Sequence, residues 1–275
     1  MAAFVLALHA HGAGVMGAAA LRSHYATIAP RLATSEFGAP LLLQSEEGGR
    51  RIDGEAFATL DQPFATVAPA LAEPSAWCEI LILHLNTKSC RRVTQANGMT
   101  IEVRIGKKEP QAPEEAQLLA FRWAGATKRA DYVAIQMEAG DCPYGTQDCR
   151  LFAEVVPLEG GRTFLHMGYA FSTSALGSVA MKMYLATVGR GKIGFTRDGG
   201  KYIAGARAIA ERNTMRYYLG IEAYFASLAQ PRDQQLEKRM ALWFDSTERY
   251  ARQLHELDRD DYLKMKREEL KRPQK

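Results

Sequence analysis

The 275-residue sequence has no long hydrophobic run, since no stretch approaches the roughly 18–20 apolar residues that a membrane-spanning helix requires. It also has little excess of one charge, because 35 basic and 31 acidic side chains leave a net charge of only +4, too small to predict a nucleic-acid partner. The catalytic and metal signatures G-x-S-x-G, H-E-x-x-H and C-x-x-C are absent. The 47% hydrophobic and 24% charged fractions exclude disordered and collagen-like classes. We therefore expect a globular protein, and the sequence identifies no catalytic residue, cofactor or metal.

The first twenty residues contain no Lys, Arg, Asp or Glu. Their short apolar run Ala2–Leu8, followed by Ala18 and Ala20, fits a secretory signal peptide cleaved after Ala20. Against this, only the terminal amine supplies positive charge, and His9 and His11 interrupt the apolar part. The alternative is a loose helical N-terminus of a cytosolic protein. We expect export, which makes the protein periplasmic.

Four cysteines form an even set, as an oxidising compartment favours. Pro143 and Gly145 would turn the chain between Cys142 and Cys149, while Cys78 and Cys90 are separated by a short stretch. Disulfides closing these two loops would stabilise the fold by about 2–3 kcal/mol each. Free buried thiols are the alternative, and zinc is disfavoured because no His lies at ligand spacing.

Periodicity predicts two short strands and two short helices in the first third of the chain. Leu41–Gln44 and Gly54–Leu60 flank the polar turn Ser45–Arg51, which indicates a hairpin. Helical spacing follows over Phe64–Ala72, and a second short helix starts at Ser75.

The middle of the chain alternates apolar and polar residues between turns that contain Gly or Pro, which predicts an antiparallel meander. Its segments are Met99–Ile105, Leu118–Trp123, Tyr132–Met137, Arg150–Val156 and Thr163–Phe171. A long helical pattern then runs from Ala204 to Leu228, and a further helix reaches Leu257. Residues 258–275 mix charges with almost no apolar face, so we expect a solvated or frayed helix.

This order of a strand pair, two short helices, antiparallel strands and a long amphipathic helix resembles the helix-grip fold of the START-like (SRPBCC) superfamily. Polyketide cyclases, lipid-transfer domains and birch-pollen-type allergens belong to it. The segments W-C-E-I-L-I-L-H-L-N (Trp77–Asn86) and G-R-T-F-L-H-M-G-Y (Gly161–Tyr169) are also similar to exported proteobacterial members. The resemblance implies an α+β domain over residues 21–228, preceded by a signal peptide over 1–20 and followed by a C-terminal helical extension over 229–275.

In such a fold a curved sheet wraps over one long helix, and the gap between them usually holds an apolar ligand. Large side chains on the inner face of the sheet and on the facing helix stripe are the candidate ligand-binding residues, with plain core packing as the alternative for each. A shift of one residue in register would exchange the two faces of a strand. The candidates are Phe121, Trp123, Phe152, Met167, Tyr169, Met215, Tyr218 and Leu219.

Arg150 and Glu154 share one strand face with Phe152, so we include them as a polar pair that would orient a ligand; a solvated ion pair is the alternative. His84 and His166 are predicted to be structural histidines. His166 alternates away from Met167, which places it on the opposite side of the sheet.

Two further patterns carry weaker predictions. Gly189–Gly194 matches G-x-G-x-x-G, but the preceding segment is helical in period, so a flexible loop or mobile lid is expected instead of a nucleotide site. Basic side chains gather at Lys88, Arg91 and Arg92 and on a nearby turn at Lys107 and Lys108. At a cavity mouth they would meet anionic lipid headgroups and give peripheral membrane contact, although solvated strand ends explain them equally well.

Three hypotheses of function result. The first is a periplasmic protein that binds, and carries, an apolar small molecule or lipid, with no nucleic-acid partner. The second is a cyclase- or hydrolase-like enzyme with Arg150, Glu154 or His166 as proton-transfer groups. The third is a structural or partner-binding envelope protein that uses the helices after Leu228 as an interaction arm. A titratable pair inside the cavity would favour the second, and a filled interior the third.

Overall fold

A computed structural model describes residues 14–96, 98–173, 183, 186–187 and 189–271. Its centre is an antiparallel eight-stranded sheet in the order β1-β2-β8-β7-β6-β5-β4-β3, built from the predicted hairpin and meander and from β3, which was not predicted from the sequence. Sequential strands are neighbours from β3 to β8, and β8 then pairs with β2. The strands are β1 (Leu41–Gly48), β2 (Arg51–Leu60), β3 (Thr87–Gln95), β4 (Gly98–Ile105), β5 (Gln117–Arg129), β6 (Tyr132–Asp141), β7 (Thr146–Leu158) and β8 (Arg162–Thr173).

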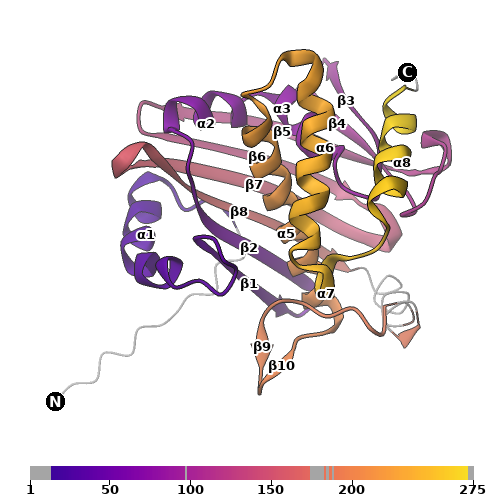
Figure 1. Cartoon of the computed structure of the whole chain (residues 1–275), viewed down its shortest axis with the longest axis horizontal. Coiled ribbons are helices and arrows are strands. Elements are labelled where there is room, and N and C mark those ends of the chain that lie inside the picture. Colours follow the sequence, from indigo (N-terminus) through magenta and orange to yellow (C-terminus); the bar gives the residue numbers. More distant parts are fainter. Residues whose placement is uncertain (1–13, 97, 174–182, 184–185, 188, 272–275) are drawn as a thin grey trace.

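Helices cover the inner face of this sheet, as Figure 1 shows for the long helix α5 and for α6 and α8. Two short helices connect β2 to β3, and a small hairpin precedes α5. These elements are α2 (Phe64–Leu71), α3 (Pro74–Leu81), β9 (Arg197–Asp198), β10 (Lys201–Tyr202), α5 (Gly205–Ser227), α6 (Arg232–Glu248), α7 (Ala251–Leu254) and α8 (Arg259–Lys271).

Helix α5 lies directly against β2 at Gly54. A Cβ atom at this position would lie 2.5 Å from Thr214 Oγ1 and 3.1 Å from the Ala210 carbonyl oxygen. Only glycine therefore permits this approach, which fixes α5 over β1, β2 and β8.

Helix α1 (Ala18–Ala33) covers part of the outer face of the sheet. Leu21, Ile28 and Leu32 of this helix pack on Phe57 and Phe164 in a second apolar cluster. Residues 1–13 lie outside the described residues, and a cut after Ala20 would fall in the first turn of α1. The signal peptide and its cleavage site remain predictions.

The expectation of a solvated C-terminal tail is wrong. Tyr262, Leu263 and Met265 of α8 are buried in the main core together with Met240 and Trp243 of α6. The burial of α8 was missed from the sequence because its charged residues suggested a solvated helix. Lys266 and Glu269 are in fact buried and form an ion pair with each other. Helices α6 and α8 therefore pack on the same core as the rest of the predicted START-like domain. The domain boundary at residue 228 remains a prediction from the sequence.

Both predicted disulfides are present, and all four cysteines are paired. Cys78–Cys90 joins α3 to β3, and Cys142–Cys149 closes the turn between β6 and β7. In the parts of the chain that the structure describes, no helix has the length and apolarity to span a membrane.

Candidate functional site between the sheet and helix α5

The structure brings most of the predicted ligand-binding residues to the inner face of the sheet and to α5. They belong to one apolar cluster on the inner face; Trp123 and Tyr169 are partly buried, and the others are fully buried. This places them together, and ligand contact by each remains a prediction. The residues are Phe121, Trp123, Met167, Tyr169, Met215, Tyr218 and Leu219.

Three predicted ligand-binding residues of β7 lie elsewhere. Phe152 and Glu154 lie on the outer face, beside His166, because Leu151, Ala153 and Val155 take the inner positions of the alternating strand. Arg150 follows the same alternation and pairs with Glu138 on β6, not with Glu154. The expected polar pair in the interior is therefore wrong.

Glu154 instead anchors α1 to the outer face. Its carboxylate is fully buried and accepts hydrogen bonds from the backbone N–H groups of Met16 (2.7 Å) and Gly17 (3.0 Å) and from the Tyr132 hydroxyl (2.7 Å). Nδ1 of His166 lies 2.8 Å from Glu154, and its Nε2 lies 3.0 Å from Glu55. Burial lowers the pKa of His166, but the hydrogen bonds and charges of both carboxylates outweigh it, so the net shift is upward. The predicted outward orientation of His166 is confirmed, and both of its ring nitrogens have hydrogen-bond partners.

Three side chains form a polar group in the interior, which we call the His84 cluster: His84, Tyr169 and Tyr217. His84 follows α3, Tyr169 lies on β8 and Tyr217 on α5. The Tyr217 ring is 5.4 Å from the His84 ring and 5.5 Å from the Tyr169 ring, measured between centroids. Sheet, helix and connecting loop therefore converge on one point.

His84 presents a hydrogen-bond donor to this point. Its Nδ1 accepts a hydrogen bond from the Asn86 backbone N–H at 3.2 Å. Burial, together with the charges of Arg216, Lys266 and Lys108, holds the pKa of His84 well below 6.5, and a weak side-chain hydrogen bond with Asn213 offsets only part of this shift. The ring is consequently neutral at pH 7 and carries its hydrogen on Nε2, which makes no hydrogen bond of good geometry with the described residues.

The two tyrosine hydroxyls are also without hydrogen bonds in the described part of the chain. Burial raises the pKa of Tyr169 to about 12 and that of Tyr217 further still, so both stay protonated. Yet both side chains are only partly buried, although they lie between the sheet and α5. Thr214, one turn before Tyr217, has a buried hydroxyl that is likewise unpaired among the described residues.

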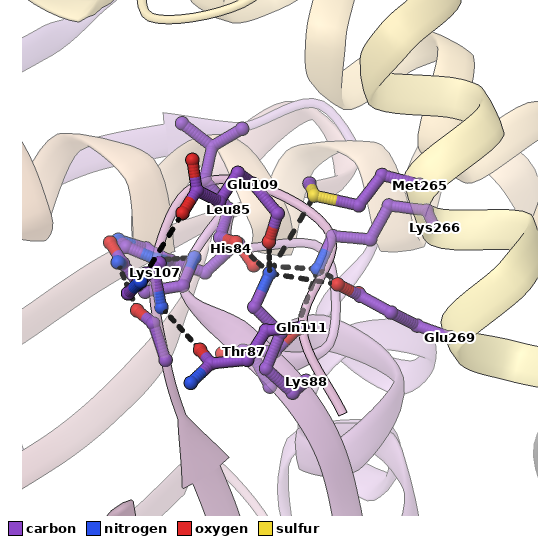
Figure 2. Close-up of polar contacts among 12 residues, drawn as sticks. His84, Leu85, Thr87, Lys88, Lys107, Glu109, Gln111, Met265, Lys266 and Glu269 are labelled. Carbon is purple, nitrogen blue, oxygen red and sulfur yellow. Dashed lines mark hydrogen bonds and ion pairs between the residues drawn. The ribbon is translucent and has the colours of Figure 1, made fainter. Parts of the chain in front are cut away.

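A buried ionic clamp fixes the position of His84 (Figure 2). Lys266 of α8 donates hydrogen bonds to the carbonyl oxygens of His84 (2.8 Å) and Thr87 (2.7 Å) and to Glu269 (2.9 Å). Lys88 of β3 reaches Glu269 (2.9 Å), the Glu109 carbonyl (3.0 Å) and the Leu85 carbonyl (3.3 Å). Each ammonium group thus has three oxygen partners, and the clamp of Lys88, Lys266 and Glu269 holds α8 against the corner that carries His84.

The predicted basic surface does not exist as one group. Lys88 is fully buried in the clamp because α8 covers this end of β3. Arg91 pairs with Glu102 across β3 and β4, whereas Lys107 is exposed beside Glu109. Lys108 pairs with Glu256 instead.

The glycine-rich segment Gly189–Gly194 is a loop and does not open a helix, as expected. Glu211 of α5 holds the residues that follow: its carboxylate accepts hydrogen bonds from the backbone N–H groups of Phe195 (2.6 Å) and Thr196 (2.9 Å). A surface cleft of about 220 Å³ lies near this loop, between Phe37, Tyr202 and α7. It includes no member of the His84 cluster.

The sequence prediction overlooked His84 and Tyr217 as site residues. Tyr217 lies in the wide apolar stripe of α5, where its hydroxyl has no distinguishing pattern. His84 lies in the apolar segment Trp77–Asn86, which suggested a satisfied histidine. A single polar side chain inside an apolar run was the available signal, and only the fold shows that two such residues meet.

Scans of protein-family models and of curated proteins found no match. Solved structures similar to this chain include norcoclaurine synthase from Thalictrum flavum, at 9% identity and a TM-score of 0.37 over 52% of this chain and 86% of that one. An aromatase/cyclase from a Streptomyces species is 16% identical, with a TM-score of 0.36 over 51% and 86% of the two chains. The lipid transfer and protein localization domain of human StarD13 is 10% identical, with a TM-score of 0.34 over 52% and 76%. The order of elements and the sheet topology described above give this chain the START-like helix-grip fold that its sequence resembles.

Proposed function

We propose that this protein binds an apolar small molecule or lipid between the sheet and α5, with the polar end of the ligand at the His84 cluster. The observation that carries the proposal is the meeting of three polar groups in an apolar interior: His84 Nε2, which makes no hydrogen bond of good geometry with the described residues, and the Tyr169 and Tyr217 hydroxyls, which have no hydrogen bond in that part of the chain. A buried polar group without a partner, as at His84 Nε2, costs about 1–3 kcal/mol, which a ligand oxygen would recover.

The surroundings define the chemistry of this ligand. Neutral His84 and two protonated tyrosines offer three donors, which suit a carbonyl, carboxylate or hydroxyl oxygen. The side chains around them, including Met167, Met215 and Leu219, are apolar, which suits a hydrocarbon body. The accessible surface that Tyr169 and Tyr217 retain supports space for it at this point.

The alternative functions have less support. The enzyme hypothesis named Arg150, Glu154 and His166, and these lie on the outer face, away from the interior. The interaction-arm hypothesis required free C-terminal helices, whereas α6 and α8 pack on the core. Export to the periplasm, carriage of the ligand and peripheral membrane contact belong to this proposal as its cellular setting.

Binding of the methyl ester of 11-(dansylamino)undecanoic acid, followed by dansyl fluorescence, tests the proposal. The ester offers a carbonyl acceptor and an apolar chain without charge. We expect saturable binding that weakens roughly three- to tenfold in Tyr217→Phe and in His84→Phe, since each loses one hydrogen bond. Tyr132→Phe, which removes a buried tyrosine hydroxyl on the outer face, is the matched control and should bind as the wild type does. Equal affinity in all four proteins would place the probe elsewhere and contradict the proposal.

A further inference from the structure

Four cations converge on one carboxylate beside the His84 cluster. Glu256, in the linker between α7 and α8, pairs with Lys108 and Arg212, with Lys192 at 3.3 Å and with Arg216 at 3.4 Å. We call these five residues the Glu256 site. They come from the turn after β4, the glycine-rich loop, α5 and the linker, so the folded chain assembles the site from segments far apart in sequence.

The site holds more positive than negative charge. Its four cationic side chains, Lys108, Lys192, Arg212 and Arg216, share the single carboxylate of Glu256. Burial opposes the charge on Glu256, yet the cations prevail and lower its pKa to about 2. Burial, and after it the charge of Arg216, lower the pKa of Lys108 to about 7. The contribution of Arg216 reflects repulsion between two cations of the site. One further anion would relieve it.

Part of the site is sealed and part is open to solvent. The side chains of Arg212 and Arg216 are 7% and 3% exposed, whereas those of Lys108 and Lys192 are 26% and 20% exposed. Nε of Arg216 is buried without a partner among the described residues. An anion can therefore enter past the lysines and reach the arginines, whose planar guanidinium groups suit carboxylate and phosphate.

The Glu256 site and the His84 cluster are adjacent. Arg216 directly precedes Tyr217 on α5, and the charges of Arg216 and Lys108 both lower the pKa of His84. A ligand whose polar end lies at His84 would thus place a terminal anionic group within reach of the Glu256 site.

We infer that the Glu256 site binds the anionic headgroup, a carboxylate or phosphate, of the ligand, and that Glu256 occupies this position in its absence. The inference rests on the proposed function and narrows the ligand class to anionic amphiphiles. Glu256 competes with the headgroup for the same cations, so binding displaces the linker between α7 and α8.

Two probes that differ only in charge test the inference: 11-(dansylamino)undecanoic acid and its methyl ester. We expect the wild type to bind the acid about tenfold more tightly than the ester, and Lys108→Gln to abolish most of this preference while keeping its affinity for the ester. Lys107→Gln, which removes the exposed neighbouring charge, is the matched control and should keep the preference. Glu256→Gln should increase it, because the competing carboxylate is gone.

The outcomes separate the two claims. If the wild type binds the acid and the ester with equal affinity, and Lys108→Gln does so too, the headgroup inference is overturned and the proposed function stands. Absence of binding by either probe overturns the proposed function. A thermal-unfolding series in inorganic phosphate against chloride at equal ionic strength then identifies the source of the anion. Stabilisation by phosphate in the wild type but not in Lys108→Gln, without probe binding, assigns the site to a free anion and overturns the headgroup inference.

Discussion

Among single residues, the members of the clamp show how this chain buries charge. Lys88, Lys266 and Glu269 are nearly inaccessible, and the two ammonium groups share one carboxylate. Backbone carbonyl oxygens supply their remaining partners. Glu269→Gln would leave two buried ammonium groups without a counter-ion, so we expect a loss of about 3–5 kcal/mol in the free energy of unfolding by urea. The triple variant Lys88→Met, Lys266→Met, Glu269→Leu removes every charge and should recover most of that loss. A triple variant as unstable as Glu269→Gln would contradict this account.

Lys266 of the same clamp makes the free energy of unfolding change with pH in the alkaline range. Burial lowers the pKa of Lys266 to about 8 in the folded protein, against 10.5 for an ordinary lysine. Between these values the unfolded chain binds more protons than the folded one, so this group makes stability rise with pH from about 8 to 10.5. We expect the free energy of unfolding of Lys266→Met, measured in urea, to rise less between pH 7.5 and 9.5 than that of the wild type. Equal slopes for the two proteins would exclude this role of Lys266.

The residues of the candidate site also show where sequence reasoning ends. Periodicity correctly assigned Met167, Tyr169, Met215, Tyr218 and Leu219 to surfaces that meet, because a stripe on α5 and alternation on β8 are local patterns. The pairing of His84 with Tyr217 spans more than 130 positions and follows no local pattern. Such a contact is fixed by how α3 and α5 pack, which the sequence does not encode in any short motif.

Among the elements, α1 explains the error on β7. The inward set of this strand, Leu151, Ala153 and Val155, is entirely apolar, whereas the outward set mixes Arg150 and Glu154 with Phe152 and Val156. The prediction took the large ring of Phe152 as the mark of the inner face, but α1 covers the outer face here and buries that ring as well. The hairpin β1–β2 and the long helix α5 were both predicted, because each follows from a local pattern.

The link between α1 and Glu154 gives a prediction about the N-terminus. A chain that begins at Leu21 lacks the Met16 and Gly17 N–H groups that donate to Glu154. We expect it to be less stable in urea than a chain that begins at Gly14, by about 1–3 kcal/mol, because buried acceptors lose charged hydrogen bonds.

Glu154→Gln should then destabilise the longer chain more than the shorter one, since only the longer chain has these donors. Equal effects of Glu154→Gln in both chains would mean that the two hydrogen bonds contribute nothing to the docking of α1.

For the molecule as a whole, the Cys78–Cys90 disulfide links the helices after β2 to the far edge of the sheet. Cys78–Cys90 spans 12 positions and fixes α3 to β3, next to the corner that carries His84. The double variant Cys78→Ala, Cys90→Ala should lose roughly 3 kcal/mol of stability by the loop-entropy relation. Urea unfolding of wild type and variant measures this, with wild type in reducing buffer as the matched comparison. A variant as stable as the oxidised wild type would contradict a structural role for the bond.

The most direct test of ligand binding is organic extraction and mass spectrometry of the protein isolated from the periplasm of a bacterium that expresses the whole chain. The account predicts an anionic amphiphile at near-stoichiometric amounts in the wild type and much less in the His84→Phe, Tyr217→Phe double variant, with Tyr132→Phe retaining it. The intact mass of the same sample tests the predicted cleavage after Ala20. A wild-type protein that carries no amphiphile, or a double variant that carries as much as the wild type, would contradict the central claim.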